Sequence, residues 1–173
     1  MGRYWWGLGA IVAAGAAGCM TAGPPERMGG PTPDRRYINP GTMAGLDGFT
    51  HAVKVGTTVY VSGEVALDSL GHLVGPGDLK AQAAQAFANL TQVLRIAGAT
   101  PADVTKLTVY VVNLHPADFQ AIRDAGPAYF PPRNPPAGTV VGVQTLPRDG
   151  LLIAVDAIAF APGMFLPRGG IPR

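Results

Sequence analysis

An amphipathic stretch from Leu79 to Ala97 is the clearest pattern in the chain. Its apolar residues recur every three or four positions: Leu79, Ala83, Ala86, Phe87, Leu90, Val93, Leu94 and Ala97. This spacing predicts a helix with one face against the core, with Asp78 as its N-cap and Gly98 at its end. The polar residues of the stretch are expected on the solvent face: Lys80, Gln82, Gln85, Asn89, Gln92 and Arg95.

Shorter apolar runs before this helix predict β-strands. Residues 49–55 alternate between apolar and polar side chains, and a second run, 57–62, follows directly after Gly56. The two runs predict a hairpin. His51 lies in the first of them, and we expect it to be a surface or packing residue.

After the helix, the β-branched and aromatic run 104–112 predicts a central strand. A second helix is expected from Pro116, because proline suits the first turn of a helix. Its apolar face would hold Phe119, Ile122 and Tyr129, and Gly126-Pro127 should break or kink it near its end.

Two apolar runs near the C-terminus, 140–146 and 151–160, predict the last strands. Pro147-Arg-Asp-Gly150 lies between them and is a turn signal, because proline presets φ and Asp-Gly tolerates positive φ. The simplest interpretation is a hairpin of two strands, each buried on both faces. Asp156 is the one charge in the second run, and a buried carboxylate requires a donor, solvent or a role.

The order of elements is therefore β-β-α-β-α-β-β, which predicts an α+β fold with a mixed sheet. The strand–helix–strand steps require crossovers, so part of the sheet is expected to be parallel. If both helices lie on one face of the sheet, the other face is left without cover. Because that face is expected to be apolar too, the pattern predicts an oligomer.

Composition narrows the function classes. The formal net charge is only +2 and no block of Lys or Arg forms a stripe, so we expect no nucleic-acid partner. Cys19 is the only cysteine, which excludes an intramolecular disulfide. The three histidines lie far apart and match no ligand spacing, so no metal site is expected.

The first residues have the character of an export signal. One arginine precedes an apolar run from Tyr4 to Ala17, which is too short to cross a bilayer comfortably. The run ends in Ala16-Ala-Gly-Cys19, which resembles the lipobox of bacterial lipoproteins, where the cysteine is acylated and tethers the protein to a membrane. Ala16 departs from that motif, which prefers leucine.

Other interpretations of this segment stay open. It is alternatively an ordinary cleaved signal or an uncleaved anchor, and translation from Met20, Met28 or Met43 would leave a cytoplasmic protein. We expect a leader at 1–19, a Pro- and Gly-rich linker at 20–36, one domain at 37–163 and a tail at 164–173.

Several short motifs in the domain resemble the RidA/YjgF family, some of whose members carry an endoribonuclease L-PSP name. They are Val59-Tyr-Val-Ser-Gly63, Gly77-Asp78, Asn89-Leu90, Ala97-Gly-Ala99, Asp103-Val104, Lys106, Thr108-Val-Tyr-Val111 and Leu146-Pro147. The resemblance implies a chorismate-mutase-like fold with two helices on one sheet face. It also implies a homotrimer with a central barrel and clefts between subunits. Active members hydrolyse enamines and imines to ammonia and a 2-keto acid, without a metal or organic cofactor.

The resemblance extends to site residues. Active members bind the substrate carboxylate with an arginine in a Pro-x-Arg element, and here Gly138 stands in place of that arginine. A family glutamate eight to ten positions past the Leu-Pro pair matches Asp156. The family's tyrosine near the first strand matches Phe49, and its Ser-Gly-Gln becomes Ser62-Gly-Glu64, which adds a negative charge.

Asp156 and Glu64 are therefore the catalytic candidates, since imine hydrolysis needs a carboxyl group to move protons. The substrate-binding candidates are Phe49, Ser62, Asn113, Arg133 and Gly138. Arg133 would replace the missing arginine from the preceding loop. For two residues a structural alternative stays open: Ser62 capping its strand, and Asn113 closing a turn.

Three functions remain open on the sequence. The first is a divergent family member that binds a different small metabolite, neutral or cationic, in the inter-subunit cleft. The second is an imine/enamine deaminase that acts on 2-iminobutanoate or 2-iminopropanoate. The third is a structural or interaction module displayed on a membrane.

Overall fold

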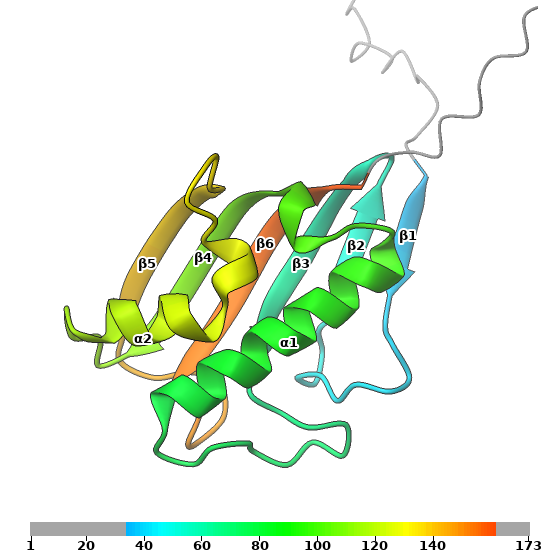
Figure 1. The fold of residues 1–173 in the computed structure, drawn as a ribbon. Helices are drawn as coiled ribbons and strands as arrows, with labels where there is room; N and C mark the ends of the chain where they lie inside the picture. Colours follow the sequence, from blue (N-terminus) through cyan, green and yellow to red (C-terminus); the bar gives the residue numbers. More distant parts are fainter. Residues whose placement is uncertain (1–33, 162–173) are drawn as a thin grey trace, which may run out of the picture. The chain divides into compact units, whose positions relative to one another are not determined.

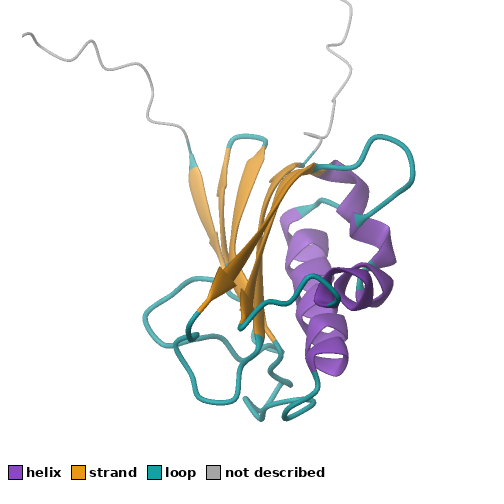
Figure 2. Ribbon diagram, turned by 90° about the vertical axis from the view of Figure 1, so that its left-hand side faces the viewer, coloured by secondary structure: helices purple, strands orange, loops and turns teal. Residues whose placement is uncertain are grey.

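A computed structural model describes residues 34–161, which form a six-stranded sheet with two helices on one face (Figures 1 and 2). The elements in chain order are β1 (Arg35–Ile38), β2 (Ala52–Val55), β3 (Thr58–Val65), α1 (Leu79–Ala97), η1 (Pro101–Asp103), β4 (Val104–Val112), α2 (Asp118–Ala125), η2 (Pro127–Tyr129), β5 (Ala137–Val143) and β6 (Ile153–Phe160). The predicted α+β fold with both helices on one sheet face is confirmed. β1 is an additional edge strand, and it begins two residues before the expected start of the domain at 37.

The ends of α1 lie where the sequence predicts them. The Asp78 carboxylate accepts a hydrogen bond from the Ala81 backbone N–H at 3.0 Å, which satisfies a free donor of the first turn. Gly98 ends the helix with φ +82°, and its N–H donates to the last-turn carbonyls. The apolar stripe between these ends packs on β3 and β6 and forms the main core.

The interpretation of the last two strands as a hairpin is wrong. The strand order is β1-β2-β3-β6-β4-β5, so β6 lies between β3 and β4 and pairs antiparallel with both. β5 instead pairs parallel with β4 and is joined to it by α2, the crossover that a parallel pair requires. As an edge strand β5 is largely exposed, so the expectation that it is buried on both faces is also wrong.

Two polar residues of α1 that were expected on the solvent face are buried. The Gln82 amide donates to the carbonyls of Gly75 (3.1 Å) and Gly150 (2.8 Å), and its oxygen accepts from the Leu152 N–H at 2.8 Å. The Asn89 amide donates to the Val65 and Leu67 carbonyls. Because each side chain satisfies backbone groups of a loop, these amides hold the end of β3 and the approach to β6 against the helix.

Side chains along the central strands alternate between the two faces of the sheet. On β6, Val155 and Ala157 are buried in the core beneath the helices, while Asp156 between them is only partly buried. On β4, Val109 and Val111 are likewise buried and Tyr110 is partly exposed. The face without helices therefore carries Asp156 and Tyr110 side by side, at diagonal positions of two paired strands.

Candidate functional site

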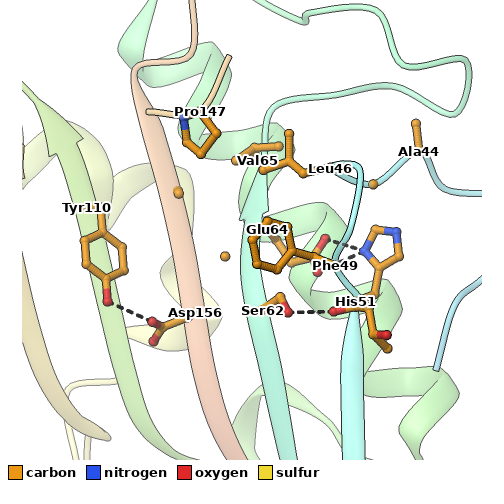
Figure 3. Close-up of a pocket in the computed structure, with 14 residues that line it drawn as sticks. Ala44, Leu46, Phe49, His51, Ser62, Glu64, Val65, Tyr110, Pro147 and Asp156 are labelled. Carbon is orange, nitrogen blue, oxygen red and sulfur yellow. Dashed lines mark hydrogen bonds and ion pairs between the residues drawn. The ribbon is translucent and has the colours of Figure 1, made fainter. Parts of the chain in front are cut away.

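A cavity of about 360 Å³ opens on the sheet face without helices (Figure 3). Its walls come from the loop between β1 and β2, the loop between β5 and β6, and strands β3, β4 and β6. The lining residues are Ala44, Gly45, Leu46, Phe49, Thr50, His51, Ser62, Gly63, Glu64, Val65, Tyr110, Pro147, Ala154 and Asp156. The walls are thus mostly apolar, with a few polar groups directed into the space, as is usual for small-molecule sites.

A β-bulge shapes one wall of the cavity. Val61 pairs with Ala157 and Glu64 with Val155, so β3 carries one residue more than β6 over this stretch. A bulge of this kind interrupts the alternation of side chains and re-aims them. Here it brings Ser62, Gly63, Glu64 and Val65 all to the lining of one pocket.

Glu64 and His51 form a close pair beside the bulge. His51 Nδ1 lies 3.0 Å and 3.1 Å from the two carboxylate oxygens of Glu64, whose side chain is only 4% exposed. The hydrogen bond that the His51 ring donates to Glu64 raises the pKa of His51, against the opposing effect of burial. A histidine that the sequence suggests as a surface or packing residue is therefore the partner of a buried carboxylate.

The backbone around His51 holds this pair in place. The His51 N–H donates to Asn39 Oδ1 at 3.1 Å, and its carbonyl accepts from the Ser62 N–H at 2.9 Å. Gly45 packs against the other edge of the ring, since a Cβ there would lie 3.0 Å from His51 Nε2. Ser62 Oγ donates to the Thr50 carbonyl at 2.6 Å, so its hydroxyl proton ties β3 to the loop.

Asp156 is the second carboxylate of the cavity. Tyr110 Oη donates to Asp156 Oδ2 at 3.0 Å (Figure 3). The same hydrogen bond, together with burial and the negative charge of Asp156, raises the pKa of Tyr110. Among residues 34–161, no donor bonds Asp156 Oδ1, so one carboxylate oxygen is available to a ligand or to water.

Comparisons with known proteins decide the family. A family model described as Endoribonuclease L-PSP matches residues 42–161. The chain belongs to the RidA/YjgF family. It is 37% identical over 117 residues to a 2-iminobutanoate/2-iminopropanoate deaminase of Rattus norvegicus, covering 67% of this chain and 82% of that protein. It is also 35% identical over 112 residues to a RutC family protein of Pyrococcus abyssi, covering 65% of this chain and 85% of that protein.

Solved structures agree with the fold. The crystal structure of RidA from Psychrobacter sp. PAMC 21119 superposes with a TM-score of 0.63 at 29% identity, covering 72% of this chain and 98% of that chain. A conserved Rid family protein of unknown function from Yersinia pestis is 47% identical, with a TM-score of 0.57 and coverage of 73% and 98%.

The RidA fold gathers only some of the residues that the sequence suggested for a site. Phe49, Ser62, Glu64 and Asp156 line the cavity just described. Gly138 lines a different cavity of about 210 Å³ between β5 and the segment around η2. Each remaining candidate lies elsewhere in the chain.

Asn113 follows β4 with φ +52° and lies in a surface hollow at the end of that strand. Arg133 is exposed on the loop between η2 and β5. Cys19 lies outside the described residues. Among residues 34–161, no three His, Cys, Asp or Glu side chains cluster as metal ligands would.

Sequence reasoning missed His51 and Tyr110 as site residues. Tyr110 lies on the same sheet face as Asp156, but this relation requires that β4 pairs with β6. His51 directly precedes β2 and Glu64 lies in β3, and these two strands form one hairpin. Because the two residues are thirteen positions apart across this hairpin, their pairing could have been predicted from the sequence.

The His51–Glu64 pair predicts a measurable pH dependence. Because the pKa of His51 is raised in the folded state, the pair's contribution to stability is fully present below the unfolded-state pKa of about 6.5. It is lost as the pH rises through the higher folded-state pKa. In Glu64→Gln, we expect NMR titration to show a lower His51 pKa and unfolding experiments to show less loss of stability over this range. The matched control is Asp124→Asn on α2, which removes a carboxylate away from the pair. The same His51 pKa in the wild type and in Glu64→Gln would contradict the pairing of His51 with Glu64.

Proposed function

We propose that this RidA family protein binds a small imine or enamine in the cavity and hydrolyses it to a carbonyl compound and ammonia. The proposal rests on the Asp156 carboxylate, which lines an apolar-walled cavity. Tyr110 donates a hydrogen bond to its Oδ2, and no donor among residues 34–161 bonds its Oδ1, which is therefore available to substrate or water. Several relatives with about one third of their residues identical are named 2-iminobutanoate/2-iminopropanoate deaminase. These names support the reaction class for this chain.

The chemistry needs a group that accepts a proton from water and returns it to nitrogen. Water adds to the imine carbon while its proton passes to Asp156 Oδ1, and the C=N bond becomes the C–N single bond of a carbinolamine. That proton then passes to nitrogen. As the C–N bond breaks and the C=O bond forms, Asp156 Oδ1 accepts the hydroxyl proton of the carbinolamine and passes it to the departing nitrogen, which leaves as ammonia. A positioned carboxylate contributes about 10²- to 10⁴-fold to such a reaction. Tyr110 keeps the carboxylate oriented through Oδ2.

Glu64 contributes in a different way. Both of its oxygens lie within 3.1 Å of His51 Nδ1, so its carboxylate is engaged rather than free to abstract a proton. We assign the pair to shaping the wall of the cavity and setting its charge.

A second candidate, binding without turnover, is favoured by the residue at position 138. The arginine that the family resemblance places there is a glycine, and Arg133 lies exposed on its loop. Loss of one partner of a buried charged pair costs about 2 to 5 kcal/mol. We therefore propose that substrates which depend on their carboxylate bind this protein weakly.

Replacing Asp156 tests the catalytic proposal. For Asp156→Asn we expect a fall in kcat of about 10²- to 10⁴-fold, because the amide cannot accept the proton from water. Ammonia release would be followed with imines generated in situ by an oxidase. Asp124→Asn carries the same charge change on α2 and is expected to retain full activity. If the wild-type protein does not accelerate ammonia release, hydrolysis is ruled out and binding without turnover remains.

We also propose that copies of this chain associate through the sheet face without helices, in the homotrimer that the family resemblance implies. Tyr60 and Phe160 on this side of β3 and β6 are 50% and 55% exposed. Large apolar side chains gathered on one face favour burial against a partner. Sedimentation equilibrium is expected to give three times the monomer mass, and Tyr60→Glu with Phe160→Glu to give monomers. A wild-type monomer would refute the proposal.

The third function that the sequence leaves open, a structural or interaction module displayed on a membrane, requires a membrane attachment. Among residues 34–161, neither helix has the length and apolar character that crossing a bilayer requires. We propose that the chain is exported and tethered by acylation of Cys19, which follows the apolar run and small residues of the leader.

Substitution of Cys19 tests the tether. With the full chain expressed in a bacterium, Cys19→Ser is expected to move the protein from the membrane fraction to the soluble fraction, because the acylated thiol is lost. Thr21→Ala is the control that keeps the cysteine. Equal membrane association of the wild type and Cys19→Ser would exclude lipid attachment at this residue.

A further inference from the structure

The ionisable groups that line the cavity have an excess of negative charge. They are the carboxylates of Glu64 and Asp156 and the imidazole of His51, with no Lys or Arg among the lining residues. His51, when protonated, balances only Glu64, because both carboxylate oxygens that it contacts belong to that residue. Asp156 therefore remains without an opposite charge within the lining that one copy of the chain supplies.

The partner of Asp156 does not neutralise it. Tyr110 Oη donates a hydrogen bond to Oδ2 but is itself uncharged. Oδ1 has no donor among residues 34–161, and Asp156 is a lining residue of the cavity. A carboxylate oxygen that has no donor forms its strongest hydrogen bond with a charged N–H donor.

Two cationic side chains on segments next to the cavity are engaged by other groups. Arg148 follows the lining residue Pro147, but its guanidinium donates to the Gly71 carbonyl at 2.7 Å. Lys106 shares the sheet face of Tyr110, and its ammonium group donates to Thr139 on β5, on the other side of β4 from Asp156. Asp47, in the loop that lines the cavity, adds a further exposed negative charge.

The rest of the cavity suits an apolar body with a cationic end. Phe49 is 70% exposed although it lines the cavity, so its ring is accessible to a ligand (Figure 3). An aromatic face attracts a cation within about 6 Å of its centre. Leu46, Val65 and Ala154 supply apolar contact on the same walls.

We propose that the cavity selects small organic cations, such as the protonated imine of a primary amine, and disfavours substrates that carry a carboxylate. Asp156 is the specificity-determining residue, with its Oδ1 accepting a hydrogen bond from the cationic nitrogen. This inference rests on the proposed imine hydrolysis and names its substrate class. Asp156 then has two roles: it is the base of the proposed hydrolysis, and it holds the nitrogen that leaves as ammonia.

Three probes of similar shape and different charge test this selectivity. Benzylamine is cationic near neutral pH, benzyl alcohol is neutral and benzoate is anionic. By calorimetry we expect benzylamine to bind the full chain about 10- to 100-fold more tightly than benzyl alcohol, the value of a charge-assisted hydrogen bond. Benzoate is expected to bind most weakly. Benzoate binding as tight as that of benzylamine would overturn the proposal.

Substitutions locate the effect. Asp156→Asn is expected to remove the preference for benzylamine over benzyl alcohol, and an unchanged melting temperature would show that the variant is folded. Glu64→Gln is expected to reduce the preference less, because His51 already opposes the charge of Glu64. Asp124→Asn should keep the full preference. A preference that survives in Asp156→Asn would assign selectivity to another group and overturn the proposal.

Turnover separates this inference from the proposed function. The imines of benzylamine and alanine, both generated by oxidases, are supplied to the wild-type protein, and ammonia release is compared. We expect kcat/KM at least about 10-fold higher for the imine without a carboxylate. Faster hydrolysis of the alanine-derived imine would overturn the proposed charge preference but support the proposed imine hydrolysis. Preferred binding of benzylamine with no turnover of either imine would retain the charge preference and exclude hydrolysis.

Discussion

The site depends on the position of β6 between β3 and β4. This pairing brings Asp156 beside Tyr110 on one side and beside the bulged segment of β3 on the other. Neither neighbour is close to Asp156 in sequence, so the cavity exists only when the central three strands are assembled. The amides of Gln82 and Asn89 secure the ends of these strands to α1 by satisfying loop carbonyls and one N–H.

Electrostatics then determine what the cavity can hold. A carboxylate that is 4% exposed is stable only with a partner, and Glu64 obtains one from His51 across the bulge. Asp156 lies where water or a ligand can reach it, and its hydrogen bond from Tyr110 leaves its charge unbalanced. The two acids of one cavity thus differ in role: the first fixes a wall, and the second is available for chemistry and recognition. In a RidA family protein with glycine at position 138, this difference is the basis of the proposed preference for ligands that bring their own positive charge.

Local signals were enough to predict much of the fold. Asp78 and Gly98 mark the ends of α1 because capping involves only neighbouring residues. The first hairpin also followed from alternation and a glycine turn. The choice of strand neighbours was not local: β5 and β6 are apolar runs joined by a turn, yet the crossover through α2 places β5 on the far side of β4.

The site was predicted less completely for the same reason. Asp156 and Glu64 were identifiable as acids in apolar surroundings, whereas their partners depend on strand register and on the bulge. Gln82 resembled a solvent-facing residue because the carbonyl it satisfies, that of Gly150, is 68 residues away. Gly138 matched the position of a family arginine, but its cavity lies apart from the one that contains Asp156.

A crystal structure of the full chain soaked with benzylamine tests the central claim most directly, since it shows which cavity and which oxygen the cation chooses. The account predicts the amine nitrogen about 2.7 to 3.2 Å from Asp156 Oδ1, with the aromatic ring against Phe49. An amine bound in the cavity beside Gly138, or away from both carboxylates, would contradict it.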